Sequence, residues 1–409
     1  MNKSVSNYPA IQFSIFRIIF GIYLTVHFLH LIPSSPDIWS HFGLFADASM
    51  NFTYGKFPNL LYIFDSPLQV QVFLSANVLL SVCYMLGVYR RAASVLLWYS
   101  WACLFHRNNL ILNPGLPMVG WVLLASALIP IGEPLSLLKP KVKEPWFMPP
   151  VLFYGAWIIA GISYTISGVD KFMAPSWRDG SAMLHLLNNP LARDGALRSL
   201  FLSLPIWIIH IKTWGALLLE IAFGPLCILK RTRPIAWILI MGMHAGILSV
   251  VDFADLTLGV MMFHLFTFDP NWFHPRVKDN DERFVFFDGV CGMCNGWVNF
   301  IMSIDTMNKL KFSPLQGSTA KKLLRESNTE AMDSIIYYEN GKLYQKSTAI
   351  LKILRNMGGM WVAPSVFLIV PANIRDSVYG WIAKNRYKFF GKKEHCRLPS
   401  PEERGRFLD

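Results

Sequence analysis

Two cysteines spaced Cys-x-x-Cys are the residues best suited to chemistry in this chain. Cys291 and Cys294 lie in the segment GVCGMC, directly after the apolar run FVFFD at 284–288. The residues that follow, 295–304, place apolar side chains at helical spacing. The dipole and unpaired N–H groups at the beginning of a helix favour the thiolate of a cysteine located there. The pattern therefore predicts a redox dithiol in which Cys291 is the nucleophile and Cys294 resolves a mixed disulfide.

A metal site is the competing interpretation of the same cysteines. Cys291, Cys294, His395 and Cys396 offer the four sulfur and nitrogen ligands of a structural zinc site. Adjacent residues such as His395 and Cys396 are awkward ligands for a tetrahedral ion, so redox exchange is favoured and no metal is expected. A purely structural role for the two cysteines stays open as a third interpretation.

Ionisable residues within long apolar stretches form a second candidate group. Such residues are costly at membrane depth and commonly mark functional sites. They are Arg17, His27, His106, Arg107, Lys171, Glu220, His244 and His264. Glu220 lies near the middle of the segment TWGALLLEIAFG, where a carboxyl group needs a proton or a cation, and Arg107 or Lys171 could supply the charge. The alternative for the whole group is a buried network that only binds helices together.

The composition predicts which parts of the chain position these residues. The chain has 409 residues, of which 53% are hydrophobic and 16% are charged. Residues 1–275 hold 17 Lys/Arg and 12 Asp/Glu, whereas residues 276–409 hold 21 and 14. Since soluble domains carry about a quarter charged residues, we expect a membrane domain over 1–275 and a soluble, cytoplasmic domain over 276–409. The net charge of +12 suits the cytoplasmic loops of a membrane protein, and a nucleic-acid partner is not expected.

Eight apolar stretches predict a polytopic α-helical membrane domain, since a helix crosses a bilayer in about 20 residues. They lie at about 11–32, 68–88, 92–112, 115–131, 150–168, 206–228, 234–252 and 254–270. Basic clusters at 90–91, 139–143 and 230–233 alternate with acidic or neutral connections. This bias predicts an integral membrane protein, in the inner or plasma membrane if the source is bacterial, with both termini in the cytoplasm. Segment 182–202 is too polar to span and predicts one or two interfacial helices on the outer face.

The C-terminal part has the pattern of a small α/β domain. Strand, helix, strand, helix, hairpin and helix are expected at 284–288, 295–304, 310–315, 319–327, 334–345 and 348–357. The Asn-Gly pair at 340–341 predicts a tight turn in the hairpin. The basic aromatic run at 384–393 predicts either a surface that lies on anionic lipid or a solvated basic face.

The membrane part resembles the HTTM family, the membrane domain shared with vitamin K-dependent gamma-carboxylase. The resemblance rests on ISGVDKFMAPSWRDGSAM at 166–183, HRNNLILN at 106–113, WGALLLE at 214–220 and the stretch 243–273. It implies that Lys171 is a catalytic base toward a vitamin K-like quinol. It also implies a cofactor site, and the residues assigned to it are His106, Arg107, Glu220 and His244.

The same segments depart from the carboxylase pattern. Asp170 replaces a neighbouring lysine, one extra residue precedes Trp177, and Thr213 stands where the carboxylase has a histidine. The domain that follows is also of another type. Glutamate carboxylation is therefore not expected, whereas quinol- or lipid-linked chemistry at Lys171 stays open. The alternative is that Lys171 only reaches the outer interface and pairs with Asp170 or Glu220.

The C-terminal part resembles the DCC-type thiol-disulfide oxidoreductase-like proteins. DGVCGMC at 288–294, SPLQ at 313–316 and the stretches 347–361 and 375–399 carry this resemblance. It implies a thioredoxin-like α/β fold in which Asp288, Cys291 and Cys294 form the family motif. Unlike thioredoxins, this chain has no proline directly before the SIIYY strand and no tryptophan before Cys291.

Together these patterns predict a membrane-anchored thiol-disulfide oxidoreductase-like protein. Its expected partners are the lipid bilayer, a quinone- or lipid-like small molecule in the membrane domain, and a protein thiol or disulfide. The two cysteines themselves require no cofactor. Two alternatives stay open. One is a carboxylase-like membrane enzyme, or a maturation or export factor for a secreted peptide, that uses Lys171; the other is a non-enzymatic membrane scaffold.

Overall fold

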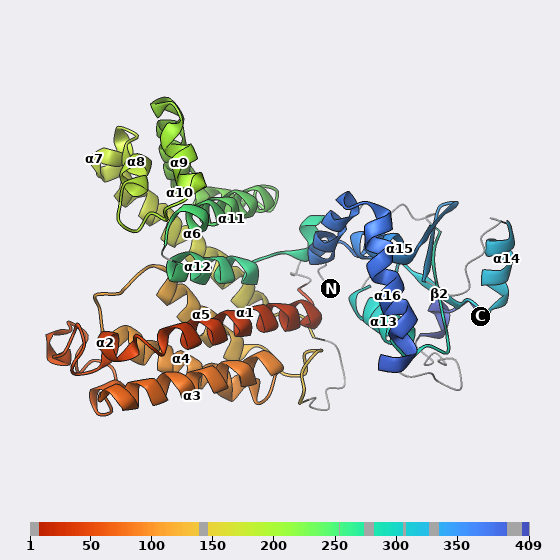
Figure 1. Cartoon of the computed structure of the whole chain (residues 1–409), viewed down its shortest axis with the longest axis horizontal. Helices are drawn as coiled ribbons and strands as arrows, with labels where there is room; N and C mark the ends of the chain where they lie inside the picture. Colours follow the sequence, from red (N-terminus) through yellow and green to blue (C-terminus); the bar gives the residue numbers. More distant parts are fainter. Residues whose placement is uncertain are drawn as a thin grey trace. The chain divides into compact units, whose positions relative to one another are not determined.

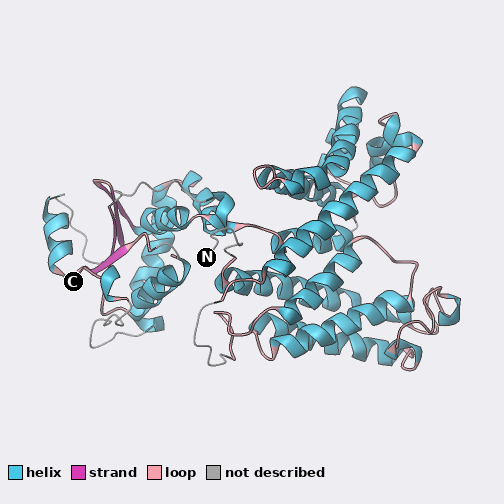
Figure 2. Ribbon diagram, turned by 180° about the vertical axis from the view of Figure 1, so that it is seen from behind, coloured by secondary structure: helices cyan, strands magenta, loops and turns pink. Residues whose placement is uncertain are grey.

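The computed structural model of the chain describes residues 8–138, 146–252, 254–273, 282–305, 308–326, 335–390 and 403–408. The chain divides into two compact units, Met1–Phe268 and Asp269–Asp409 (Figure 1). Within the described residues, all strands of the sheet belong to the second unit, while the first is built from helices and loops (Figure 2).

Helices form in the first unit at each of the eight apolar stretches. They are α1 (Ala10–Leu31), α3 (Pro67–Leu86), α4 (Arg90–Arg107), α5 (Gly115–Leu128), α6 (Pro150–Met173), α10 (Ile206–Ile228), α11 (Arg233–Val250) and α12 (Ala254–Phe266). Among the described residues five of them, α1, α3, α6, α10 and α11, are long and apolar enough to cross a membrane. Helix α4 carries arginine at both ends, and α5 and α12 have only 14 and 13 residues. A count of eight spans therefore stays a prediction.

Short helices connect these elements. They are α2 (Ser35–Trp39), η1 (Ala48–Met50), η2 (Leu60–Tyr62), α7 (Pro175–Arg178), α8 (Ala182–Leu187) and α9 (Ala196–Ser203), whereas η3 (Pro270–Phe273) belongs to the second unit. Helices α7 and α8 pack against α10 (Figure 1). Segment 182–202 is thus largely helical, as expected, whereas its location at a membrane surface stays a prediction.

Helices α6 and α10 pack closely because glycines line their contact. A Cβ atom at Gly168 would lie 2.6 Å from the backbone nitrogen of Ile221, and one at Gly224 would lie 2.6 Å from Thr165 Oγ1. Small residues at helix crossings let the backbones of membrane helices approach each other. This close pair brings side chains of the two helices within bonding distance.

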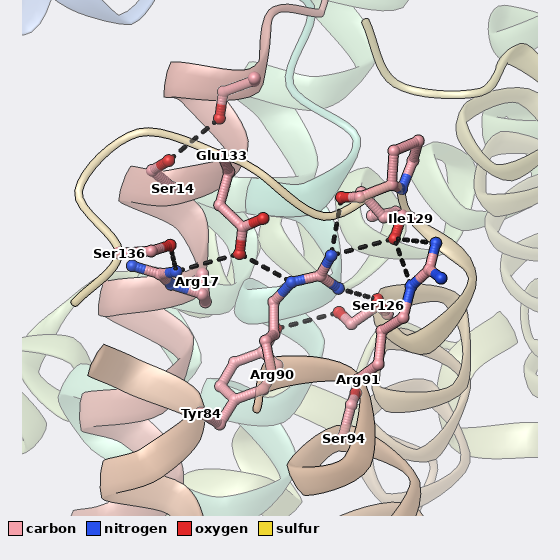
Figure 3. Close-up of polar contacts among 12 residues, drawn as sticks. Ser14, Arg17, Tyr84, Arg90, Arg91, Ser94, Ser126, Ile129, Glu133 and Ser136 are labelled. Atoms are coloured by element: carbon pink, nitrogen blue, oxygen red, sulfur yellow. Dashed lines mark hydrogen bonds and ion pairs between the residues drawn. The ribbon is translucent and has the colours of Figure 1, made fainter. Parts of the chain in front are cut away.

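A buried charge network ties α1 and α4 to the chain that follows α5 (Figure 3). One carboxylate oxygen of Glu133 lies 3.0 Å from Arg17 Nη1 and 2.7 Å from Arg90 Nε. Arg17 also donates to Leu135 O at 2.7 Å, and Arg90 donates to Ile129 O at 2.9 Å. All three charged side chains are buried, so each depends on these partners. For Arg17, the structure supports the interpretation of a network that binds helices together.

The second unit contains one mixed four-stranded sheet. Its strands are β1 (Arg283–Phe287), β2 (Lys311–Pro314), β3 (Ile336–Glu339) and β4 (Lys342–Gln345), in the order β2-β1-β3-β4. Strand β1 is parallel to β2 and antiparallel to β3, and β3 pairs with β4 as a hairpin. Asn340 and Gly341 join the hairpin with φ angles of 46° and 83°. These positive angles are typical of a type I′ turn, so the predicted tight turn is confirmed.

Helices cover this sheet and carry the chain between its strands. They are α13 (Gly292–Ile304), α14 (Ser318–Glu326), α15 (Lys346–Met357), η4 (Gly359–Ile369), α16 (Ala372–Phe390) and η5 (Arg404–Arg406). Helix α13 connects the parallel strands β1 and β2 and packs against both β1 and α16. The predicted order of strands and helices in this unit is therefore confirmed, and the carboxyl end of β1 leads directly into α13.

Candidate functional site

Strand β1 and helix α13 position the Cys-x-x-Cys motif. Cys291 is the N-cap of α13, with φ −85° and ψ 121°. Its sulfur accepts a hydrogen bond from the backbone N–H of Cys294 at 3.3 Å. This is the bond by which an N-cap side chain satisfies an unpaired N–H group of the first helical turn. The sulfur of Cys291 thus lies at the positive end of the helix dipole.

Both cysteines are buried, and the two thiols are not equivalent. Cys291 is 0% exposed and Cys294 is 5% exposed. Burial raises the pKa of Cys294 to about 12, and the hydrogen bond and charge repulsion from Cys291 add to the effect. The positive charge of Arg386 opposes this rise, and the negative charge of Asp288 adds to it. Cys294 therefore holds its proton at neutral pH.

Asp288 is a buried carboxylate directly after β1. Its Oδ1 accepts hydrogen bonds from Val290 N–H at 3.2 Å and from Gln316 Nε2 at 3.4 Å. Its Oδ2 accepts a hydrogen bond from Arg386 Nη2 at 3.2 Å. Asp288 is only 5% exposed, and a buried charge needs such a partner to be tolerated. The structure thus brings Asp288, the two cysteines and Arg386 into one site.

Arg386 is a site residue that the sequence interpretation missed. The basic run 384–393 predicts a lipid-facing or solvated surface, and residues 391–393 of this run lie outside the described residues. Lys384 and Lys388 are exposed on α16, but Arg386 is 5% exposed. For Arg386 the prediction is wrong, because its ion pair with Asp288 draws the guanidinium into the core of the unit.

The sequence of α16 contains one indication that Arg386 is buried. Tyr379 lies seven residues before Arg386, and a separation of seven places two residues on one face of a helix. The Tyr379 hydroxyl accepts the backbone N–H of Ile335 at 3.1 Å. Tyr379 and Arg386 thus share the inward face of α16. The basic residues around Arg386 in the sequence suggest a surface position instead.

Two of the four ligands in the zinc interpretation are not tested by the structure. His395 and Cys396 lie outside the described residues. Among the residues that the structure does describe, no group of three or more metal-binding side chains lies together.

Lys171 and Glu220 meet between α6 and α10. Lys171 Nζ lies 2.6 and 2.5 Å from the two carboxylate oxygens of Glu220 and 3.0 Å from Ser167 Oγ. The Ser167 hydroxyl in turn donates to Glu220 Oε2 at 3.1 Å. The side chain of Lys171 is 30% exposed and that of Glu220 is 7% exposed. Of the two cations that the sequence offers to Glu220, Lys171 is the one that pairs with it.

His244 belongs to a different hydrogen-bonded group. Its Nε2 lies 2.7 Å from the hydroxyl of Tyr164, which also lies 2.8 Å from Nε2 of His264. A phenol has one proton to donate, so it donates to one imidazole and accepts from the other when both rings are neutral. All three side chains are buried.

His106 and Arg107 hold the connection between α1 and α3. Arg107 donates to Phe45 O at 2.7 Å and lies 3.9 Å from Asp65 Oδ2. The ring of His106 stacks on Phe57 with ring centres 4.8 Å apart. Their contacts are with this connection, and Arg107 does not serve as the partner of Glu220.

Known relatives match the second unit. The family model of DCC1-like thiol-disulfide oxidoreductases matches residues 285–392. The uncharacterized protein YuxK of Bacillus subtilis is 47% identical over 129 residues, which are 94% of that protein and 31% of this chain. A chloroplastic DCC family protein of Arabidopsis thaliana is 37% identical over 124 residues, which are 72% of that protein and 29% of this chain. No solved structure gives a significant match.

These matches set the extent of the family assignment. They cover the unit that carries Asp288, Cys291 and Cys294, and the resemblance of the first unit to the HTTM family stays a prediction. Through its C-terminal unit, which matches the family model described as DCC1-like thiol-disulfide oxidoreductase, the chain belongs to the DCC family.

Proposed function

We propose that this chain is a membrane-anchored thiol-disulfide oxidoreductase in which Cys291 and Cys294 exchange disulfides with a protein partner. The hydrogen bond from Cys294 N–H to Cys291 Sγ carries this proposal, because it directs a helix N-terminus at the attacking sulfur. The strand order β2-β1-β3-β4, with one parallel pair followed by a hairpin, supports a thioredoxin-like fold for the unit.

The proposed reaction has two exchange steps. The Cys291 thiolate attacks a disulfide of the partner, forms a mixed disulfide and releases one partner thiolate, which takes up a proton from water. Cys294 then gives up its proton and attacks the Cys291 sulfur, which releases the second partner sulfur as a thiol. The partner gains two electrons and two protons, and Cys291 and Cys294 end as a disulfide. The reverse sequence oxidises a partner dithiol.

We assign Asp288 to receive the proton of Cys294 and to pass it on to the departing partner sulfur. Its negative charge acts on Cys294, and its carboxylate is the proton acceptor that the motif itself supplies. Arg386 is a positioning residue, because its ion pair holds one carboxylate oxygen of Asp288.

A redox titration tests the proposal. Purified full-length protein is equilibrated in a glutathione series, and its alkylated thiols are counted by mass spectrometry. We expect the two cysteines to interconvert reversibly at a potential between about −120 and −300 mV. Cys291→Ser should abolish the transition, whereas Cys83→Ser, outside the motif, should leave it unchanged. Thiols that stay unreactive, or zinc that co-purifies and blocks alkylation, would overturn the proposal.

We propose that the N-terminus and the C-terminal unit both face the cytoplasm. Five helices of the described residues can span a membrane, which supports membrane anchoring. Both ends on one side require an even number of crossings, so the orientation includes α4, α5 and α12 as further spans. The basic clusters at 90–91 and 230–233 support the orientation, because positive residues collect on the cytoplasmic side.

A quinone- or vitamin K-like ligand at Lys171 is a separate hypothesis, and the present arrangement does not fit a base. The ammonium group of Lys171 has three protons, and the two oxygens of Glu220 and the hydroxyl of Ser167 accept them. No lone pair is then available to take a proton from a ligand. We therefore derive no step through a quinone.

Two variants separate this hypothesis from the thiol chemistry. If only Cys291→Ser removes the effect of the protein in its host cell, the thiol exchange carries the function. If only Lys171→Ala removes it, the membrane unit carries chemistry of its own, including a role in the maturation of a secreted peptide. If neither does, a scaffold is the better description.

A further inference from the structure

A cavity of about 580 Å³ lies between α6 and α10. On its α6 side lie Ile158, Ile162 and Ile166, which follow one another at intervals of four on one helix face. They are 61%, 57% and 56% exposed. Because both helices are long and apolar enough to span a membrane, large exposed apolar side chains on this face are expected to contact lipid.

Small residues form the floor of this cavity. Gly161 and Gly224 face each other, and a Cβ atom at Gly161 would lie 3.4 Å from the Cα of Gly224. Pro225 follows inside α10 and has no N–H group to donate. The two glycines let the helix backbones meet at this floor, and apolar side chains of α6 and α10, among them Ile162 and Ile228, form the walls of a channel above it.

One end of this channel carries an uncompensated positive charge. Arg233, the first residue of α11, donates from Nε to Cys227 O at 2.6 Å. Its guanidinium lies 5.5 Å from the ring centre of Tyr154 and 5.8 Å from that of Trp157. None of the ion pairs among the described residues includes Arg233. Its remaining N–H groups are therefore available to an anion.

The surrounding chain adds to this charge. Lys230 and Arg231 lie three and two residues before Arg233 and are exposed. The N-terminus of α11, an 18-residue helix, contributes the positive end of its dipole at the same place. An apolar channel that ends in such a group of cations matches an amphipathic molecule with a negatively charged head.

We propose that this cavity binds one anionic phospholipid, with an acyl chain along α6 and the phosphate at Arg233. The helix rises about 18 Å from Tyr154 to Ile166 at 1.5 Å per residue, which gives the chain an extended apolar wall. The planar guanidinium suits a phosphate because it can donate two parallel hydrogen bonds. The positive group of a zwitterionic lipid would lie close to Lys230, Arg231 and Arg233 and be repelled by them. A lipid whose head group has a net negative charge is therefore preferred. The proposal is independent of the thiol chemistry.

Native mass spectrometry of the full-length protein in detergent tests the site. The protein is delipidated and then titrated with palmitoyl-oleoyl phosphatidylglycerol or with phosphatidylcholine of the same chains. We expect one phosphatidylglycerol per chain, bound about tenfold more tightly than phosphatidylcholine, as for the loss of one charge-assisted contact. Equal affinity for the two lipids in the unmodified protein would overturn the proposal.

Variants separate the head site from the channel. Arg233→Gln should reduce the affinity for phosphatidylglycerol to that for phosphatidylcholine, whereas Arg233→Lys should keep most of the preference. Ile162→Trp should weaken both lipids because the indole fills the channel. Lys212→Gln removes an exposed cation from α10 outside the cavity lining, so it is the matched control and should change little.

Three further outcomes would contradict the assignment. Unchanged phosphatidylglycerol binding in Arg233→Gln would exclude the head site. Displacement of the lipid by glycerol phosphate alone would show a phosphate site without a chain channel. A dimer that Ile162→Trp dissociates would show that a second copy of the chain covers the cavity.

Discussion

The two cysteines of the motif differ because only one of them caps the helix. The sulfur of Cys291 accepts the N–H of Cys294 at the beginning of α13, where the helix dipole favours a thiolate. Cys294 lies one turn further along, is nearly fully buried, and holds its proton through a raised pKa. This difference gives the residues separate parts in the proposed exchange, with Cys291 attacking and Cys294 resolving.

The pKa of Cys294 predicts how its reactivity depends on pH. We expect its alkylation rate in the reduced protein to rise about tenfold per pH unit from about pH 7 to about pH 10, without a plateau. The thiolate is the reactive form, and its fraction grows tenfold per unit as long as the pH is below the pKa of about 12. Residue-resolved mass spectrometry after iodoacetamide treatment measures this rate.

The denatured protein is the control for this experiment. Its thiols should level off near the ordinary thiol pKa of about 8.5. A plateau below about pH 9 for Cys294 in the folded protein would contradict the burial that raises its pKa.

Helix α16 stabilises the Cys-x-x-Cys motif, although it is not part of the β1–α13 segment that carries the motif. It packs against α13 and sends Arg386 to Asp288, which is 98 residues earlier in the chain. The same helix face carries Tyr379, whose hydroxyl accepts the N–H of Ile335 directly before β3. The end of β1, the hairpin and the last long helix are thereby joined around the two cysteines.

Removal of the Arg386 cation should therefore loosen the motif. We expect Arg386→Gln to destabilise the C-terminal unit by about 3 kcal/mol, because it leaves the buried Asp288 charge without its guanidinium. The denaturant concentration at which Cys294 becomes open to alkylation measures this local stability.

Two comparisons make the result specific. Lys384→Gln changes an exposed cation on the same helix and should leave the midpoint in place. The double variant Asp288→Asn/Arg386→Gln should recover part of the loss, since no buried charge then remains unpaired. An unchanged midpoint in Arg386→Gln would show that the ion pair does not hold the motif.

The junction of α3 and α4 depends on the absence of a side chain at Gly87. This residue ends α3 with φ 73°, and a Cβ atom there would meet Arg17 Nη1 and lie 2.5 Å from Ser136 Oγ. We expect Gly87→Ala to destabilise the helical unit by about 2 kcal/mol, because the left-handed backbone and the displaced Arg17 both contribute.

The thermal midpoint of the protein in detergent, read as the fraction that stays soluble after heating, checks this expectation. Gly242→Ala is the control, since an added Cβ there meets nothing within 4 Å. Equal midpoints for the two variants would show that the Arg17–Glu133–Arg90 network adapts to the added methyl group.

For the whole molecule, the two units differ in where their large apolar side chains lie. The helical unit exposes large apolar side chains along α3, α6, α10 and α11, and surfaces of this kind are unstable in water. The C-terminal unit instead encloses its apolar strand residues, among them Val285, Phe286 and Phe287, each 0% exposed. The surface of the helical unit is therefore suited to lipid, whereas the exposed apolar side chains of the C-terminal unit lie on η4 and α16, among them Ile369 and Trp381.

The proposed orientation predicts which surface positions an impermeant reagent reaches. We expect Ser199→Cys, on α9, to react with a membrane-impermeant maleimide on intact cells. Lys230→Cys, in a basic loop, should react only after the cells are permeabilised, because positive loops stay in the cytoplasm. Labelling is measured as the increase over the protein without the added cysteine. Labelling of position 230 on intact cells, with position 199 labelled only after permeabilisation, would contradict the proposed topology.

The sequence alone predicted the features that depend on neighbouring residues. Helical periodicity and apolar length located the helices of the first unit, and alternating strand and helix patterns located the elements of the second. The Asn340-Gly341 turn and the N-terminal position of Cys291 on α13 follow from local backbone preferences. Each of these features is determined by residues that lie close together in the sequence, so one short segment is enough to predict it.

The tertiary structure decided which charged residues become partners. Arg107 and Lys171 were equal candidates for Glu220, and only the packing of α6 against α10 selects Lys171. Arg386 lies in a basic run that reads as surface, yet the placement of α16 beside α13 buries it against Asp288. A buried charge is stable only where a partner from a distant segment meets it. That meeting is fixed by the folding of the whole unit. The seven-residue spacing of Tyr379 and Arg386 places them on one helix face but does not identify the partner of Arg386.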